Sequence, residues 1–236
     1  MQILGDDAVA SAPDVQFNII INPASGPGST VYPDSNYIAG VAKLNSYSNT
    51  KLLGYVPTTY ARRSQSSVLS DIDRYAKWST YKAADIHMDG IFFDETPSTY
   101  TSAAASYMST ISARVKSSLG SANNYIVFNP GVVVDSRYYN YANLVVAWEN
   151  YAKYFSTSSS ISAIPKAVRA KTAVILHHFT GTTTTQKTII NNIVNQGVKG
   201  VYITSSSDFT SYPQLWTSFC STLRSATYRA AAKLRI

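Results

Sequence analysis

Seven short apolar runs recur along the chain, and longer stretches of mixed apolar and polar residues separate most of them. The runs are Phe17–Asn22, Lys51–Val56, Gly90–Glu95, Tyr125–Asn129, Leu144–Glu149, Thr172–His177 and Val198–Thr204. Each run is nearly continuously apolar, as is typical of strands in a parallel sheet that is covered on both faces. The pattern therefore predicts seven buried parallel strands.

Helical spacing is found in four stretches that lie between or after these runs. They are Ser67–Ala83, Ser98–Leu119, Thr183–Gln196 and Pro213–Lys233, and Gly120 and Gly197 are suitable stops for the second and third. Alternating strands and helices predict a parallel α/β fold. Because no dinucleotide-binding fingerprint is present, a (β/α)8 TIM-type barrel is favoured over an open doubly wound sheet. No composition break divides the chain, so residues 1–236 are predicted to form a single domain.

Charge adds little to this picture. Only 14% of the 236 residues are charged, and the net charge is +7. The basic residues are scattered over predicted helices and loops, and no nucleic-acid-binding motif accompanies them, so no nucleic-acid partner is expected. Cys220 is alone and its helical context predicts a small buried residue. The N-terminus lacks the features of a signal peptide, and no apolar run approaches the about 18 residues of a membrane span.

Acidic residues mark the ends of two predicted strands. The chain has only two glutamates, Glu95 and Glu149, and each ends an apolar run, with Asp94 directly before the first. In a TIM-type barrel the carboxyl ends of the strands carry the active site. Convergent carboxylates at that edge suit acid–base chemistry on a sugar. The alternative is that these acids cap helices or pair with Arg137 and Lys153.

Other polar or aromatic residues also lie at strand ends. Asn22 and Asn129 each precede a proline and are expected to bind substrate hydroxyls, while Tyr55 and Trp148 are candidates for stacking on a sugar or for core packing. His177 and His178 end another strand, so one of the two imidazoles is expected to face the barrel mouth as a hydrogen-bonding group, and His177 is the candidate.

Two other motifs do not support a site of their own. The loop Asn22–Gly28 resembles a phosphate-binding loop, but Pro27 removes a donor and no Lys-Ser/Thr follows. The segment Asp85–Asp89 has ligand-like spacing but precedes its strand, on the side where barrels keep structural residues. No metal site is therefore predicted. No nucleophile elbow or Cys–His pair suggests acyl transfer.

Taken together, these motifs resemble the spherulin-4-like proteins of glycoside hydrolase family 135, from about residue 8 to about residue 222. The stretches that carry the resemblance are FNIIINPASGPG (Phe17–Gly28), LGYVPTTY (Leu53–Tyr60), Ile72–Trp78, GIFFDE (Gly90–Glu95), VFNPG (Val127–Gly131) and VAWEN (Val146–Asn150). The first and fourth stretches, found in this order, are the most specific.

The resemblance implies an endo-α-1,4-N-acetylgalactosaminidase that acts on a galactosaminogalactan-type fungal polysaccharide. It places the family's acids on Asp94, Glu95 and Glu149, with Asp94 or Glu95 as nucleophile or substrate-assisting carboxylate and Glu149 as general acid/base. It also implies an extracellular or cell-wall location, no cofactor and a monomer. The alternative is a non-catalytic spore- or cell-wall protein that binds carbohydrate.

One departure concerns the N-terminus. Family members begin with a strand and a helix before the stretch equivalent to Phe17–Gly28, whereas here Ala8–Pro13 resembles only the end of that helix. The first barrel strand is therefore expected to be missing or replaced, as in a truncated or alternative gene product of reduced stability and impaired activity.

Overall fold

Seven parallel strands form one sheet in the described part of the protein. The computed structural model describes residues 9–206, 209, 211 and 213–233. The strands are β1 (Phe17–Ile21), β2 (Thr50–Pro57), β3 (Gly90–Asp94), β4 (Tyr125–Phe128), β5 (Leu144–Tyr151), β6 (Thr172–His177) and β7 (Gly200–Ile203). Their order in the sheet is their order in the chain. This topology, with helices between successive strands, is that of a TIM-type α/β barrel with seven strands in place of eight.

An α-helix follows each strand except β4, which is followed by a 3₁₀ helix only. The α-helices are α2 (Ser35–Asn45), α3 (Gln65–Lys77), α4 (Ser102–Leu119), α5 (Ser159–Ser162), α6 (Thr183–Asn195) and α7 (Trp216–Lys233). Short 3₁₀ helices are η1 (Trp78–Thr80), η2 (Ser136–Asn140), η3 (Ala152–Tyr154) and η4 (Lys166–Lys171). Side chains at the N-caps of α2, α3, α4 and α6 (Asp34, Ser64, Thr101 and Thr182) accept hydrogen bonds from the first turn.

The chain divides into two compact units. The first holds Gln16–Pro130 and Val134–Val145, and the second holds Gly131–Val133 and the chain from Val146 onward, with the described residues before Gln16. Strand β5 therefore begins in the first unit and continues in the second.

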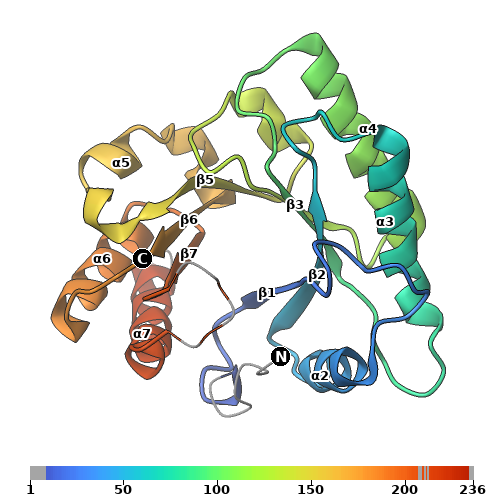
Figure 1. The fold of residues 1–236 in the computed structure, drawn as a ribbon. Coiled ribbons are helices and arrows are strands. Elements are labelled where there is room, and N and C mark those ends of the chain that lie inside the picture. The colour runs from blue at the N-terminus through green and yellow to red at the C-terminus, as the bar shows by residue number, and fades with distance from the viewer. Residues whose placement is uncertain (1–8, 207–208, 210, 212, 234–236) are drawn as a thin grey trace. The chain divides into compact units, whose positions relative to one another are not determined.

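In the first unit, β1 to β4 pair in a regular parallel register. Tyr55 of β2 is opposite Phe92 of β3, and Phe93 of β3 is opposite Phe128 of β4. Helices α3 and α4 pack against each other beside these strands (Figure 1). Tyr75 and Trp78, both fully buried, close the core next to β2, where Tyr75 lies so close to Gly54 that no Cβ would fit there.

In the second unit, β6 pairs with β7, and helices α6 and α7 pack together (Figure 1). A buried apolar cluster lies between strands and helices, and it consists of Ala147, Ile161, Ile164, Val174, Ile193 and Val198. Cys220 of α7 is buried, as the sequence predicts, and burial raises the pKa of its thiol to about 12.

Several element bounds differ from the sequence-based expectation. The predicted helix Ser67–Ala83 begins at Gln65 and ends at Lys77, where η1 takes over, and helix α2 was not predicted. Strand β5 continues two residues beyond Glu149, to Tyr151. The expectation that the first barrel strand is missing or replaced concerns the start of the chain, and residues 1–8 lie outside the described residues. Among the residues described, no helix has both the length and the apolar character needed to cross a bilayer.

Candidate functional site

Backbone strain gathers at the carboxyl ends of the strands. Among the described residues, the non-glycine residues with positive φ are Ser25, Thr59, Tyr60, Ala61, Glu95, His178 and Phe209. Each lies in a loop that follows a strand, and none precedes one. A non-glycine residue in this conformation costs about 1–3 kcal/mol and tends to occur at functional sites. This supports the carboxyl ends of the strands as the candidate site.

Asp94 is the last residue of β3, and both oxygens of its carboxylate accept hydrogen bonds. Tyr55 of β2 donates its hydroxyl to Oδ2 at 2.6 Å, and Asn129, directly after β4, donates Nδ2 to Oδ1 at 2.8 Å. The donors come from the two strands that flank β3, so the parallel register positions them. The carboxylate is half-buried and held in one orientation.

Glu95 follows Asp94 in a left-handed conformation, with φ of 51°. Its backbone carbonyl accepts hydrogen bonds from the Tyr60 amide at 2.6 Å and the Thr58 hydroxyl at 2.8 Å. The carbonyl of Asp94 accepts from the Thr58 amide at 2.9 Å. The turn after β2 thus holds the backbone of both acids. Within the described residues, no hydrogen bond or ion pair involves the Glu95 carboxylate, which is half-buried.

Glu149 lies in the part of β5 that belongs to the second unit. Its amide donates to the carbonyl of Gly131 at 2.9 Å. Gly131 has φ of 68°, and a Cβ added there would lie 3.7 Å from the Cβ of Glu149. The loop after β4 therefore runs directly beside Glu149, and a glycine suits both the backbone conformation and the close approach.

Asn22 and Trp148 make contacts within the protein. Asn22 is exposed, and its side-chain oxygen accepts a hydrogen bond from the Gly26 amide at 2.9 Å, which organises the loop after β1. Trp148 packs against the apolar cluster of the second unit and meets Phe155 edge to face at 5.6 Å. The core-packing alternative accounts for these contacts of Trp148.

At the end of β6, the imidazole rings of His177 and His178 lie within hydrogen-bonding distance of each other. Their Nδ1 atoms lie 2.7 Å apart, so one ring donates and the other accepts. Burial and the neighbouring His178 lower the pKa of His177. Tyr151 stacks on His178 at 4.3 Å between ring centroids and meets His177 edge-on at 4.7 Å.

Sequence reasoning missed Thr58 and Tyr151. A signal for Tyr151 was present, because four aromatic residues fall between positions 148 and 155, directly at a strand end. The contribution of Thr58 depends on the turn conformation after β2, which no motif in the sequence specifies.

The expected alternative partners of the acids are otherwise engaged. Arg137 pairs with Asp135 at 2.7 Å and lowers the pKa of that carboxyl to about 2. Lys153 lies over the rings of Tyr151 and Tyr154.

The segment Asp85–Asp89 forms a structural connection before β3. His87 Nδ1 lies 2.6 Å from Asp85, and Asp89 accepts the Leu52 amide of β2 at 2.7 Å. The carboxylates of Asp89, 3.8 Å from Nε2, and Asp85 raise the pKa of His87 to about 9. No group of three potential metal-binding side chains occurs in the part of the chain that is described.

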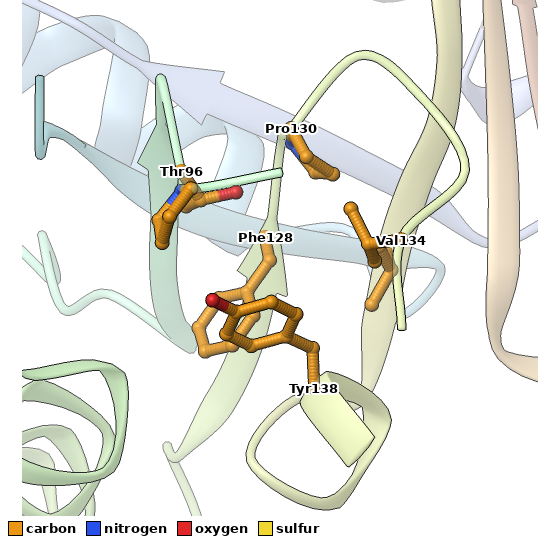
Figure 2. A pocket seen from close by; sticks show the side chains of 7 residues that line it. Thr96, Phe128, Pro130, Val134 and Tyr138 are labelled. Atoms are coloured by element: carbon orange, nitrogen blue, oxygen red, sulfur yellow. The ribbon is translucent and has the colours of Figure 1, made fainter. Parts of the chain in front are cut away.

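Two pockets occur in the first unit, and neither is lined by Asp94, Glu95 or Glu149. Figure 2 shows the first, an apolar space beside the residues that follow β3 and β4, and it has no room for a water molecule. Its lining residues are Thr96, Pro97, Phe128, Pro130, Val134, Tyr138 and Val145. The second is a polar surface groove of about 390 Å³ over helix α3, lined in part by Asp73, Arg74 and Lys77. Neither pocket is shaped as a substrate cleft at the carboxylates.

Comparison with known sequences identifies similar proteins. The model of spherulation-specific family 4 matches residues 6–223. Spherulin-4 of Physarum polycephalum is 32% identical over 212 residues, which are 85% of this chain and 59% of that protein. The chain thus spans somewhat more than half the length of this curated relative.

Among solved structures, Aspergillus clavatus Sph3 in complex with GalNAc is similar with a TM-score of 0.84 and 33% identity, over 93% of this chain and 90% of that one. A GH18 chitinase from Pseudoalteromonas aurantia is 13% identical, with a TM-score of 0.57 over 92% of this chain and 97% of that one. At that identity, the chitinase likeness concerns the fold alone.

Proposed function

Because the chain belongs to spherulation-specific family 4, we propose that it is a glycoside hydrolase that cleaves α-1,4-linked N-acetylgalactosamine in a galactosaminogalactan-type polysaccharide. The observation that carries the proposal is the Asp94 carboxylate, held at a strand end by Tyr55 and Asn129. The similarity to Sph3, whose structure contains GalNAc, supports the choice of sugar. An extracellular or cell-wall location follows from that choice of polymer.

Most glycoside hydrolases cleave the glycosidic bond with two carboxyl groups. One protonates the leaving oxygen, and the other stabilises or attacks the positively charged anomeric carbon. Glu149 takes the first role in this proposal, and Asp94 or Glu95 takes the second. The two hydrogen bonds to Asp94 fix its orientation before substrate arrives, and such preorganisation lowers the cost of reaching the transition state.

The positive φ of Glu95 suits the same proposal. The turn after β2 donates hydrogen bonds to the backbone carbonyls of Asp94 and Glu95. These bonds hold the backbone of both acids, and with it the directions in which the two side chains start. A strained residue kept in place by hydrogen bonds is typical of a position where side-chain direction matters more than stability.

The test is release of reducing ends from purified N-acetylgalactosamine polymer. The wild type is expected to release them, and Glu149→Gln, Asp94→Asn and Glu95→Gln are expected to lower the rate by about 10²–10⁴-fold, the usual contribution of a general acid or base. Circular dichroism of each variant controls for folding. A Glu149→Gln variant as active as the wild type would remove Glu149 from the chemistry.

A second candidate is a wall protein that binds carbohydrate without cleaving it. The observation in its favour is the pair of exposed tyrosines at the end of β5, Tyr151 and Tyr154. Their rings can bind a sugar without help from a carboxylate. A folded wild type that binds the polymer and releases no reducing ends would establish this function instead.

A further inference from the structure

Two exposed tyrosines and a lysine lie in one short segment at the end of β5 and directly after it. Tyr151 ends the strand, and Lys153 and Tyr154 belong to the 3₁₀ helix η3. Tyr154 is 60% exposed, more than any other large hydrophobic side chain in the described residues, and Tyr151 is 39% exposed. We call these three residues the tyrosine ledge.

Both tyrosine rings of the ledge contact other aromatic rings although they are exposed. The ring of Tyr151 is stacked on His178, and Tyr154 meets Tyr151 edge to face at 6.1 Å. The two other aromatic residues of the same stretch, Trp148 and Phe155, pack against the core cluster of this unit. Folding therefore uses Trp148 and Phe155 and leaves the tyrosines in solvent, where a held aromatic ring can stack on the apolar face of a sugar at low entropic cost.

Lys153 gives the ledge a charge. Its ammonium lies 5.3 Å from the ring centre of Tyr151 and 4.8 Å from that of Tyr154, within the range of a cation–π contact. No carboxylate in the described part of the chain forms an ion pair with it. The ammonium group has three donors and no acceptor, so it can donate to an acetamide oxygen or a hydroxyl of a bound sugar.

These properties distinguish an N-acetylated sugar from one with a free amine. An acetamide offers Lys153 a neutral acceptor. An ammonium group on the sugar offers none. If it lay about 5 Å from the Lys153 ammonium, the repulsion between the two groups would weaken binding by about fourfold in bulk water and by more where less solvent lies between the charges. The rings of the ledge would attract such an ammonium, but Lys153 already occupies that position.

We propose that the tyrosine ledge is a sugar-binding subsite. A neutral N-acetylated sugar unit of the polysaccharide stacks on Tyr154, and Lys153 repels sugar units that carry a free amine. This inference rests on the proposed function, because it takes an amino-sugar polymer as the ligand. In this proposal Lys153 determines which sugar is bound and takes no part in the reaction of the carboxylates.

Binding tests the proposal without chemistry. Dissociation constants are measured by calorimetry for α-1,4-linked N-acetylgalactosamine oligosaccharides and for the same oligosaccharides after N-deacetylation, in the Glu149→Gln background. Tyr154→Ala is expected to weaken binding of the acetylated form about tenfold. Lys153→Gln is expected to bring the two forms to within about threefold of each other, from a preference of about tenfold in the parent.

A matched pair elsewhere serves as the control. Lys43 lies over the ring of Tyr47 at 5.5 Å, at the end of helix α2 and apart from the strand ends. Tyr47→Ala and Lys43→Gln are expected to leave both dissociation constants unchanged. Equal binding by parent and Tyr154→Ala, or an unchanged preference in Lys153→Gln, would overturn the proposal.

Its failure is distinguishable from failure of the proposed function. If the wild type cleaves the polymer while the ledge variants bind like the parent, the ledge proposal alone fails. If the ledge variants behave as expected but the wild type releases no reducing ends, the ledge stands and the hydrolase proposal fails.

Discussion

The Asp94 carboxylate depends on two neighbouring side chains for its orientation. A hydrogen bond to a carboxylate contributes about 1.5–3 kcal/mol, which corresponds to about 10- to 100-fold if it is needed in the transition state. Tyr55→Phe removes one of these bonds, of 2.6 Å, and keeps the ring. Tyr55 acts in this account as a positioning residue for Asp94.

We therefore expect Tyr55→Phe to lower kcat by about 10- to 100-fold with little change in KM, as measured by initial rates on the polymer. Tyr32→Phe is the control, because it removes a hydroxyl that lies 2.9 Å from Thr80, outside the site. Equal losses in the two variants, or a change confined to KM, would mean that Tyr55 does not position the acid.

His87 gives the stability of the protein a pH dependence. Because Asp89 and Asp85 raise its pKa to about 9, the protonated imidazole stabilises the folded state. This contribution is complete below the unfolded-state pKa of about 6.5 and is lost as the pH rises through about 9. Since Asp85 is well exposed, we expect the contribution to be roughly 1–3 kcal/mol.

The measurement is urea unfolding of the wild type and of His87→Gln at pH 6 and at pH 10. The free energy of unfolding of the wild type should exceed that of the variant at pH 6, and the difference should shrink at pH 10. Comparing differences removes the contribution of other groups that titrate in the same range. A difference that stays constant between the two pH values would contradict this role of His87.

At the scale of elements, the turn after β2 carries three consecutive residues with positive φ, Thr59, Tyr60 and Ala61. Left-handed backbone costs a residue with a Cβ about 1–2 kcal/mol, whereas glycine adopts it freely. The carbonyls of Asp94 and Glu95 bind this turn, so its strain is maintained at the candidate site.

Ala61→Gly is therefore expected to raise the free energy of unfolding by about 0.5–1 kcal/mol, after the larger backbone entropy of glycine in the unfolded chain is included. Ala76→Gly, in helix α3, is the matched control and should lower it by about 1 kcal/mol. Denaturant unfolding measures both. Destabilisation by Ala61→Gly would show that the turn is not strained.

The strands were predictable from the sequence because their runs are apolar, and in β3, β4 and the first half of β5 successive residues are buried on both faces. The expected coverage of both faces is wrong for β1, whose residues alternate between buried and exposed. Helix α2 was not, because its sequence contains Gly40 and only Gly40, Val41 and Leu44 are buried. The continuation of β5 to Tyr151 was also missed, since Glu149 and Asn150 end the apolar pattern although the strand continues.

The sequence names the candidate residues of the site but not their contacts. Tyr55, Asn129 and Asp94 were all identified as strand-end residues, but their joining depends on the register in which Pro57 lies opposite Asp94. That register is set by pairing between segments distant in sequence, and no local pattern contains it. The strained turn at Thr59–Ala61 is equally invisible in a sequence without glycine at those positions.

At the scale of the whole molecule, the sequence predicts a single domain, and the chain forms two compact units that share strand β5. A shared strand cannot leave one unit without disturbing the other, so we expect the chain to unfold in one cooperative transition. Hydrogen exchange in increasing urea, followed by mass spectrometry, should expose the amides of β2 and of β6 at the same concentration. Exposure of one strand well before the other would contradict the single-domain prediction.

We have proposed that this protein hydrolyses a glycosidic bond with Glu149 as the acid. The most direct measurement is digestion of N-acetylgalactosamine polymer in ¹⁸O-labelled water, with the fragments identified by mass spectrometry. The account predicts fragments with one heavy oxygen at each new reducing end from the wild type, and almost none from Glu149→Gln. Unlabelled fragments, no fragments from a folded wild type, or equal release by Glu149→Gln would contradict it.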